Sequence, residues 1–480
     1  MATNQNQKPH AIMISLPLQG HIIPFVNLAI KIASKGFSVT FAHHEFVHHH
    51  ISNSQYNSTD VDIFAQARSS GLDINYTTIS DGFPIEFDRS ADSDTYMESY
   101  FSRFPEKVDE LVGKIVRSRS SSGSNFFLIS DTFSLWPAKI AEKYGLVDVS
   151  FWTEPALVFS LYYHLQLLRE NGHVPVNGRW ENVDYLPGIQ SINTKDFMSY
   201  LQGSELTLLH KLIFQAFDTV KSADFILCNT VQELEAEAIS ALQEKQPFYT
   251  IGPLFQGDFK NSLVARSLLP ESNCTEWLNS RPAGSVLYIS FGSLAKTDKN
   301  VILEIAGGIL LSQVSFIWVI RPGMVDSDGG GILPEGFEDR TRDRGLIVPW
   351  CTQNQVLLNP ATGGFLTHCG WNSIVESIWS GVPMICHPLF TDQITNRKLV
   401  VDDWKVGIDL CDGASVTREE VAEKIGALMS GKRADELRQE IKKVRETLQN
   451  ALMEDGSSEK NFDSFVEDVK AEIERRCEKI

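Results

Sequence analysis

Two side chains in the first third of the chain have the types and positions of a proton-transfer pair. His21 follows Gly20 soon after a short apolar run, and Asp131 ends the run Leu128–Asp131. Both runs have the length of buried strands, and open α/β sheets bind ligands where such strands end. A histidine there can accept a proton near neutral pH, and a carboxylate on its second nitrogen fixes the tautomer and stabilises the imidazolium. The structural alternatives are helix caps, with Asp131 capping the helix around Trp136.

A second group of polar residues occupies a comparable position in the other half of the chain. The run HCGWNS, from His368 to Ser373, follows an apolar strand and opens a helix, and Gly292-Ser293 repeats this arrangement after an earlier strand. Helix N-termini attract anions, so two such turns at one cleft suit a diphosphate. Glu376, one turn into the helix, can accept two hydroxyl protons from a ribose, and Trp350 can stack on a flat base.

Three other patterns resemble metal or nucleotide sites but have simpler structural explanations. Gly426–Arg433 has the glycine and lysine spacing of a P-loop but lacks its magnesium-binding hydroxyl residue, and its apolar residues fit a buried helix face. The histidines at 43, 44, 48, 49 and 50 lack cysteine or carboxylate partners at ligand spacing, which favours a partly exposed strand and helix start. The DxD triplets lie in polar segments typical of solvated loops: Asp60/Asp62, Asp92/Asp94 and Asp326/Asp328. We therefore expect no metal site.

The elements that must position these residues alternate between apolar runs and helical patterns. Strands are predicted over 11–16, 37–42, 126–130, 147–152, 285–291, 316–320 and 364–367. Helices are predicted after the first strand, ending at Gly36, over 136–143, over 299–311 and from Thr417 onward. This alternation favours parallel, doubly wound α/β layers.

The periodicity lapses near the midpoint of the chain, over Gly252–Asn273. We therefore predict two Rossmann-like domains, over 1–252 and 276–455, joined by a linker over 253–275. The last segment, 456–480, is expected to pack back on the first domain.

Composition and charge narrow the classes of function. The 480 residues carry 43 basic and 61 acidic side chains, a net charge of −18, which disfavours binding to nucleic acid or anionic lipid. Seven scattered cysteines without a CxxC pair predict reduced thiols rather than disulfides or a zinc site. No apolar run has the length of a signal-peptide core or a membrane span. We expect a cytoplasmic monomer without a membrane anchor.

The segment Trp350–Gln393 resembles, at its full 44 residues and without gaps, the donor-binding signature of plant UDP-glycosyltransferases, the family 1 glycosyltransferases of plant secondary metabolism. Its tryptophan, glutamine, HCGWNS, glutamate and final Asp-Gln positions all agree. Further similar segments lie along nearly the whole chain: Leu18–His21, Ser130-Asp131, Arg281–Ser285, Ser290–Ser293 and Phe316–Val319. The resemblance implies the GT-B fold, whose two facing Rossmann-like domains bind the acceptor mainly through the first and the UDP-sugar through the second.

The resemblance also implies a role for each matching residue. It assigns the UDP-sugar contacts as follows: uracil to Trp350 and Gln353, ribose to Glu376, diphosphate to Ser293, His368, Asn372 and Ser373, and glucose to Asp392 and Gln393, with Trp371 nearby. A final glutamine favours glucose in this family. His21 and Asp131 match the family's catalytic positions.

These assignments predict transfer of glucose from UDP-glucose to a hydroxyl of a small lipophilic plant metabolite, phenolic or terpenoid, with inversion to a β-glucoside. No metal or other cofactor is expected, because His368, Ser293 and a helix N-terminus meet the charge on the departing UDP. The alternatives are another UDP-sugar as donor, a UDP-sugar epimerase, and a UDP-sugar-binding protein without catalysis.

The acceptor cleft is the part of the site with the weakest sequence signal. Several aromatic residues are candidates for the walls of an apolar acceptor cleft, with packing in the core as the alternative: Phe83, Phe87, Trp136, Phe151-Trp152 and Tyr162-Tyr163. Two departures from the family pattern bear on the site. Thr352 stands where proline is usual, and Ile22-Ile23 replace the commoner Ile/Val-Asn after His21.

Overall fold

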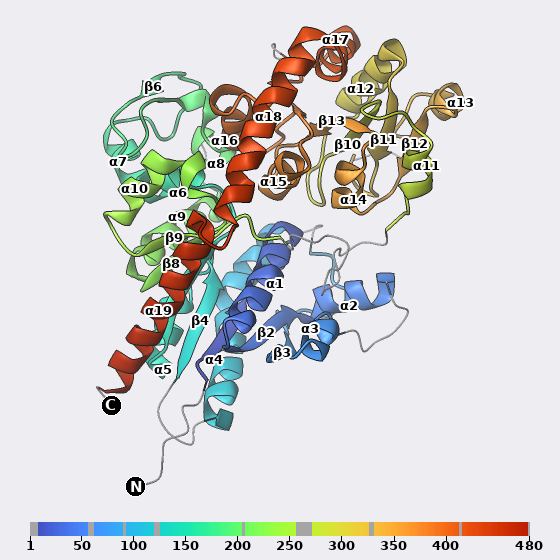
Figure 1. Ribbon diagram of the computed structural model, residues 1–480. Coiled ribbons are helices and arrows are strands. Elements are labelled where there is room, and N and C mark those ends of the chain that lie inside the picture. The colour runs from blue at the N-terminus through green and yellow to red at the C-terminus, as the bar shows by residue number, and fades with distance from the viewer. Residues whose placement is uncertain are drawn as a thin grey trace.

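Two parallel β-sheets, each packed against helices, form two domains that face each other (Figure 1). This computed structural model describes residues 8–55, 62–89, 93–119, 125–203, 207–255, 271–325, 331–411 and 415–478. The predicted doubly wound α/β architecture is confirmed. Most of the predicted linker, residues 256–270, lies outside the described residues.

The first sheet has the strand order β3-β2-β1-β4-β5-β8-β9. Its strands are β1 (His10–Ile14), β2 (Ser38–His44), β3 (Ile74–Ile79), β4 (Phe126–Asp131), β5 (Val147–Trp152), β8 (Phe225–Cys228) and β9 (Phe248–Thr250). Strand β1 pairs in parallel with both β2 and β4, so the order reverses between β1 and β4. A crevice opens at such a reversal, outside the carboxyl ends of the strands.

The second sheet repeats this arrangement with the order β12-β11-β10-β13-β14-β15. Its strands are β10 (Val286–Ser290), β11 (Ser315–Val319), β12 (Gly345–Val348), β13 (Thr362–Thr367), β14 (Met384–Cys386) and β15 (Gly407–Asp409). Its order reverses between β10 and β13, where Ser290 pairs with Thr367. The predicted strands of both sheets are found within two residues of their expected ends. A short antiparallel pair, β6 (Asn182–Val183) and β7 (Ile192–Asn193), completes the strands of the described chain.

Helices join the strands in both domains. In the first half they are α1 (Gln19–Ser34), α2 (Glu45–Gln55), α3 (Ala65–Ser69), α4 (Ser93–Arg119), α5 (Pro137–Tyr144), α6 (Ala156–Tyr163), α7 (Leu165–Glu170), α8 (Ser199–Gln202), α9 (Leu208–Thr219) and α10 (Ala236–Gln243). In the second half they are α11 (Thr275–Asn279), α12 (Lys299–Ser312), α13 (Phe337–Thr341), α14 (Gln353–Leu358), α15 (Trp371–Ser380), α16 (Gln393–Lys398), α17 (Arg418–Met429), α18 (Gly431–Ala451) and α19 (Ser457–Cys477).

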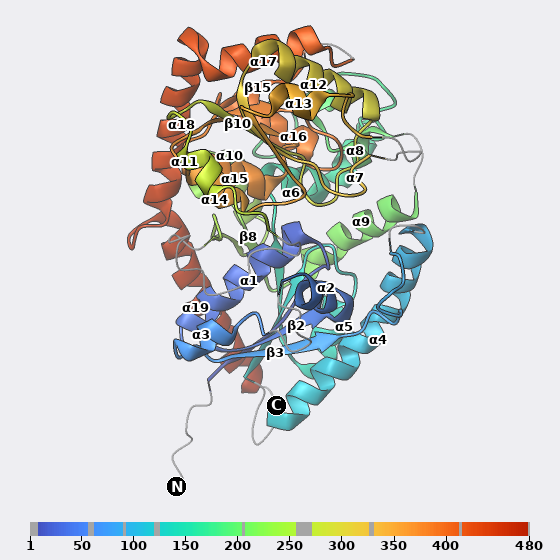
Figure 2. The ribbon, with the colours of Figure 1, turned by 90° about the vertical axis from the view of Figure 1, so that its right-hand side faces the viewer.

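The last helix, α19, leaves the second domain and runs along the first (Figure 2). Its apolar face, including Phe462, Phe465 and Val469, belongs to the buried core under the first sheet. Arg476 donates to Asp224 at 2.6 Å and anchors the end of the helix. The chain therefore crosses between the domains twice, once after β9 and once before α19.

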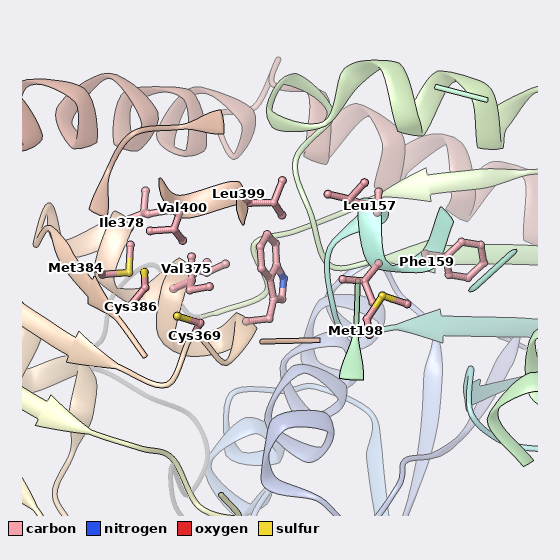
Figure 3. Close-up of a cluster of buried hydrophobic side chains, with 14 of the residues drawn as sticks. Leu157, Phe159, Met198, Cys369, Val375, Ile378, Met384, Cys386, Leu399 and Val400 are labelled. Atoms are coloured by element: carbon pink, nitrogen blue, oxygen red, sulfur yellow. The ribbon is translucent and has the colours of Figure 1, made fainter. Parts of the chain in front are cut away.

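A shared hydrophobic core also joins the domains, and Figure 3 shows part of it. Leu157, Phe159 and Met198 come from the first half of the chain, and Cys369, Val375, Ile378, Met384, Cys386, Leu399 and Val400 from the second. Full burial of a valine, leucine, isoleucine, methionine or phenylalanine side chain stabilises the folded protein by about 1.5–3 kcal/mol through the hydrophobic effect. Because the core is shared, it fixes the two sheet edges relative to each other.

The motifs that the sequence analysis set aside lie outside the domain crevice. The five histidines lie on a strand and the following helix start, as predicted: His48 and His49 are half-buried and His50 is exposed on α2. His43 and His44 on β2 are buried rather than partly exposed, and burial lowers the pKa of His43 to about 4. The P-loop-like segment forms the junction of α17 and α18, with Leu428 in the core and Lys432 exposed. Asp62 pairs with Arg68.

All six aspartates of the DxD triplets were expected in loops, and four of them lie outside the described residues: Asp60, Asp92, Asp326 and Asp328. For Asp94 the expectation is wrong, because this residue belongs to the first turn of helix α4. Over the described chain, no group of three His, Cys, Asp or Glu side chains has the geometry to hold a metal ion. No helix there is long and apolar enough to cross a membrane.

Candidate active site

A cavity of about 410 Å³ lies between the two sheet edges. Its size is in the usual range for small-molecule sites. All of the site residues predicted from the sequence line it except Asp131, which lies behind His21: His21, Ser293, Trp350, Gln353, His368, Trp371, Asn372, Ser373, Glu376, Asp392 and Gln393. Because both sheets reverse their order at this crevice, residues that are far apart in the sequence share one space.

His21 and Asp131 form a buried pair at the reversal of the first sheet. His21 lies in the first turn of α1, which begins at Gln19, and Asp131 is the last residue of β4. The Nδ1 atom of His21 lies 2.7 Å from Oδ2 of Asp131, and the Thr153 hydroxyl lies 3.2 Å from the same nitrogen. A carboxylate at Nδ1 places the ring proton there, which leaves Nε2 free to accept a proton.

The helix-cap alternatives for these two residues are wrong. The residue at the N-cap of α1 is Leu18, and the N-cap of α5 is Trp136; neither cap uses a side-chain hydrogen bond. The second oxygen of Asp131, Oδ1, accepts the backbone N–H of Phe133 at 3.1 Å instead. The Asp131 carboxylate is therefore held on both oxygens, and its orientation toward His21 is fixed.

The charges around His21 make its imidazole easier to protonate than it would be if burial acted alone. Burial lowers the pKa of His21, but the charge and hydrogen bond of Asp131, and the charge of Asp392, outweigh burial and raise that pKa above 6.5. Asp392 belongs to the second domain, so the raised pKa reflects both sides of the cavity. The imidazolium that forms when His21 accepts a proton is thus stabilised.

Two turns lie at the reversal of the second sheet, and they carry the residues that the sequence analysis assigned to the diphosphate. Ser293 follows β10, and His368 follows β13 and precedes α15. The N-cap of α15 is Gly370, without a side-chain cap, so the first N–H groups of this ten-residue helix remain available to an anion. The neighbouring Cys369 has a positive φ of 66°, which turns the chain sharply from strand into helix.

The His368 ring lies between the two turns, and each turn has a glycine beside it, Gly292 and Gly370. Because these glycines have no side chains, there is room for the ring. A Cβ atom at either Gly292 or Gly370 would lie 2.5 Å from Nε2 of His368. Burial and the nearby Arg321 guanidinium, opposed by a backbone hydrogen bond at Ser290, lower the pKa of His368 to about 4. The ring is therefore neutral near pH 7 and can meet a phosphate oxygen only as an N–H donor.

The side chains expected to hold the uracil and the ribose are linked through Gln353. The Gln353 amide donates to the Ser373 hydroxyl at 2.9 Å and to Oε2 of Glu376 at 2.8 Å, and its oxygen accepts from Tyr288 at 3.3 Å. Burial raises the pKa of Glu376 to about 7, although the Gln353 bond lowers it. Trp350 lines the same end of the cavity.

The structure restricts the hydrogen bonds that Gln393, expected to contact glucose, can make to a ligand. Its carbonyl oxygen accepts the backbone N–H groups of Leu389 and Phe390 at 3.0 and 3.2 Å. Only its NH₂ group remains for a ligand, whereas the sequence analysis left the whole amide available. Asp392 is held by Thr391 and Asn396, and burial raises its pKa.

Asn372 and Trp371 reach across to the first domain. The Asn372 amide donates to the carbonyl of Gly20 at 2.9 Å, directly before His21. The Trp371 indole donates to the carbonyl of Asn229 at 2.8 Å, and its ring is buried in the shared core. Both side chains thus join the start of α15 to the first domain, and Asn372 joins it to the turn that carries His21; the sequence did not reveal these contacts.

The acceptor end of the cavity has aromatic and aliphatic walls. Of the aromatic residues that the sequence analysis considered for the acceptor cleft, Tyr162 lines the cavity. The others pack in or against the cores instead: Phe83, Phe87, Trp136, Phe151, Trp152 and Tyr163. The walls that the sequence analysis missed are Tyr96, Met97, Tyr100, Phe101, Phe133, Tyr200, Leu209 and Ile213. Several come from α4 and α9, whose amphipathic pattern gives no sign of which residues face a cavity.

Both departures from the family pattern lie at the cavity. Thr352 donates its hydroxyl to Glu271 at 2.6 Å, a contact that proline cannot make. Ile22 packs in the core, and Ile23 lines the acceptor end where a polar asparagine is common. The second departure makes the acceptor end more apolar.

Comparisons with known proteins agree with this geometry. The family model described as UDP-glucoronosyl and UDP-glucosyl transferase matches residues 208–439. UDP-glycosyltransferase 86A1 of Arabidopsis thaliana is 52% identical over 99% of this chain and 97% of its own length. The chain therefore belongs to the plant UDP-glycosyltransferases, enzymes that transfer a sugar from a UDP-sugar, as the signature segment predicted.

Two further proteins bear on substrate and fold. The 7-deoxyloganetin glucosyltransferase of Gardenia jasminoides is 35% identical over 96% of this chain and 98% of its own. The solved structure of UGT2 from Phytolacca americana, complexed with UDP-2fluoro-glucose and pterostilbene, superposes with a TM-score of 0.79 at 26% identity, covering 96% of this chain and 99% of that one. The predicted GT-B fold is confirmed.

Proposed function

We propose that this enzyme moves glucose from UDP-glucose to a hydroxyl group of a small lipophilic molecule, with inversion to a β-glucoside. The observation that carries the proposal is one cavity lined by His21, by the two anion-binding turns and by apolar acceptor walls. The relatives support glucose, since the name of one states glucosyl transfer and the ligand of another is a UDP-glucose analogue.

In the proposed reaction, His21 acts as the base and the UDP as the leaving group. The acceptor hydroxyl gives its proton to Nε2 of His21 as its oxygen forms a bond to the anomeric carbon. The bond from that carbon to the diphosphate oxygen breaks on the opposite face, and UDP departs with the electron pair. Asp131 stabilises the imidazolium, and a well-placed base of this kind contributes about 10²–10⁴-fold in rate.

The second domain is proposed to bind the donor. Trp350 and Gln353 hold the uracil, Glu376 the ribose, and Asp392 and Gln393 the glucose. The diphosphate contacts are proposed for Ser293, His368, Ser373 and the N-terminus of α15, with Asn372 shared between the donor turn and Gly20. Preorganised N–H donors of this kind stabilise the charge that develops on UDP.

A mass-spectrometric screen of acceptor pools with UDP-glucose tests the proposed function. We expect products that are one hexose heavier than neutral hydroxyl compounds in the pool, with UDP released in equal amount. A reaction without acceptor is the control. UDP-galactose formed in that control would identify an epimerase, and binding of UDP-glucose without turnover in any pool would identify a non-catalytic binder.

Transfer is expected to survive treatment with EDTA. The helix N-terminus and the neutral His368 ring already supply donors for the diphosphate, so this proposal requires no metal or other cofactor. Initial rates before and after chelation and desalting provide the measurement. Loss of activity that Mn²⁺ restores would contradict the proposal and would direct attention to the DxD triplets.

Gln393→His is expected to lower the use of UDP-glucose relative to UDP-galactose while inhibition by UDP stays the same. The substitution removes the amide NH₂ from the sugar position and releases the backbone of Leu389 and Phe390, but it leaves the uracil, ribose and diphosphate contacts in place. Competition between the two donors measures the effect. An unchanged donor ratio would show that Gln393 does not select the sugar.

A further inference from the structure

Glu154 is a polar side chain of the cavity that the proposed reaction does not use. It lies two residues beyond β5, next to Thr153, whose hydroxyl is 3.2 Å from the catalytic imidazole. It lines the cavity together with His21, Tyr162 and Tyr200. Its position is therefore at the acceptor end, beside the base and among the aromatic walls.

The backbone after Glu154 is fixed from outside the cavity. Glu235 accepts the N–H groups of Ala156 and Leu157 at 3.1 and 2.7 Å and thereby caps the start of α6. The Trp152 indole donates to the carbonyl of Pro155 at 2.9 Å on the other side. Glu154 is held between two anchored segments, so it lines the cavity from a defined place.

The carboxyl group of Glu154 has no hydrogen-bond partner among the described residues, in contrast to Glu235, which has three. Burial first, and then the charges of Asp392 and Asp131, raise the pKa of Glu154 well above its usual value. These effects favour the neutral acid form, which offers one O–H donor and acceptor oxygens to a ligand, over the carboxylate.

The same surroundings act on any acceptor that occupies the cleft. Among the described residues that line the cavity, none is a lysine or an arginine, whereas Glu154, Glu271, Glu376 and Asp392 are acidic. A carboxylate on the acceptor would meet the same desolvation and the same neighbouring charges. No lysine or arginine is there to compensate, and the His21 imidazole is already paired with Asp131.

We propose that Glu154 determines acceptor specificity: its carboxyl group hydrogen-bonds a second polar group of an uncharged acceptor, and the acidic cleft, which has no lysine or arginine among its described lining residues, rejects acceptors that carry a carboxylate. The inference rests on the proposed function for the identity of the cleft. It narrows the acceptor to a neutral alcohol or phenol that carries a further hydroxyl, carbonyl or ester group.

Binding of two matched probes to the enzyme–UDP complex tests the inference separately from transfer. The probes are para-hydroxycinnamate and its methyl ester, which share the phenol and ring and differ in charge. Calorimetry at neutral pH is expected to show the ester binding about 100-fold or more tightly than the carboxylate. Equal or tighter binding of the carboxylate, or no binding of the ester, would overturn the inference. Selective binding without any glucosyl transfer would overturn the proposed function alone.

Substitutions at Glu154 separate its hydrogen bond from its packing. Glu154→Gln keeps a donor and an acceptor of the same size, whereas Glu154→Leu keeps only the bulk, so the ester is expected to bind about tenfold more weakly to the leucine variant than to the glutamine variant. Glu154→Lys supplies a cation and is expected to reduce the preference for the ester at least about tenfold. UDP affinity reports the folding of each variant, and equal ester binding by the Gln and Leu variants would overturn the role of Glu154.

Discussion

Replacing His21 by alanine is expected to lower the rate of glucosyl transfer by about 10²–10⁴-fold, the usual contribution of a general base. The affinity for UDP should remain nearly unchanged, because the nucleotide contacts proposed here all come from the second domain. Alanine is the best helix former, so α1 is not weakened by the change. Turnover under saturating UDP-glucose, together with UDP binding by calorimetry, measures both quantities.

His50→Ala is the matched control, since His50 is an exposed histidine in helix α2 outside the cavity. Transfer by this variant should equal that of the unmodified enzyme. A His21→Ala enzyme that keeps its turnover within about tenfold, or that loses UDP binding together with turnover, would show that His21 is not the base.

The pH dependence of the rate provides an independent test of the pair. The pKa of His21 is raised above 6.5, so the rate should fall as the pH drops through this raised value and the base becomes protonated. Asp131→Asn removes the main charge that opposes burial, so the acidic limb of the profile should move to lower pH while the maximum rate falls. An acidic limb at the same pH in both enzymes would contradict the pairing.

Glu376→Ala is expected to raise the KM for UDP-glucose by about tenfold or more with little effect on acceptor affinity. Hydrogen bonds to a charged group contribute about 1.5–3 kcal/mol each, and the Glu376 carboxylate is proposed to accept from the ribose. The variant also frees the Gln353 amide that now donates to Glu376. Initial rates at varied UDP-glucose and a fixed, saturating acceptor provide the measurement.

The protonation of Glu376 gives this prediction a second readout. Burial raises its pKa to about 7, so the carboxylate takes up a proton as the pH falls through that value, and the KM for UDP-glucose should then rise. Glu376→Gln, which cannot titrate, should flatten this dependence. Glu446→Ala, at an exposed position on α18, serves as the control. A KM that rises equally at low pH in the Gln variant would assign the effect to another group.

Much of the fold and the outline of the site follow from the sequence alone. Apolar runs such as 147–152 and 364–367 have strand length and β-branched or aromatic content, and helical patterns separate them, which determines a parallel α/β architecture. Polar residues that directly follow such runs, as Asp131 and His368 do, must lie at the carboxyl edge of a sheet. The signature segment Trp350–Gln393 then determined the family, because its spacing is long and specific.

Only the tertiary structure decided how these edges meet and which side chains complete the site. The bond from Asn372 to Gly20 spans 352 positions, and the walls supplied by Tyr96, Tyr200 and Glu154 come from three separate segments. The local pattern of apolar residues indicates which face of a helix or strand is apolar. A face that packs in the core and a face that lines a cavity, however, have the same pattern. Strand order and the packing of the two domains decide whether such a face is buried in the core or lines the cavity. Both result from contacts between residues far apart in the sequence.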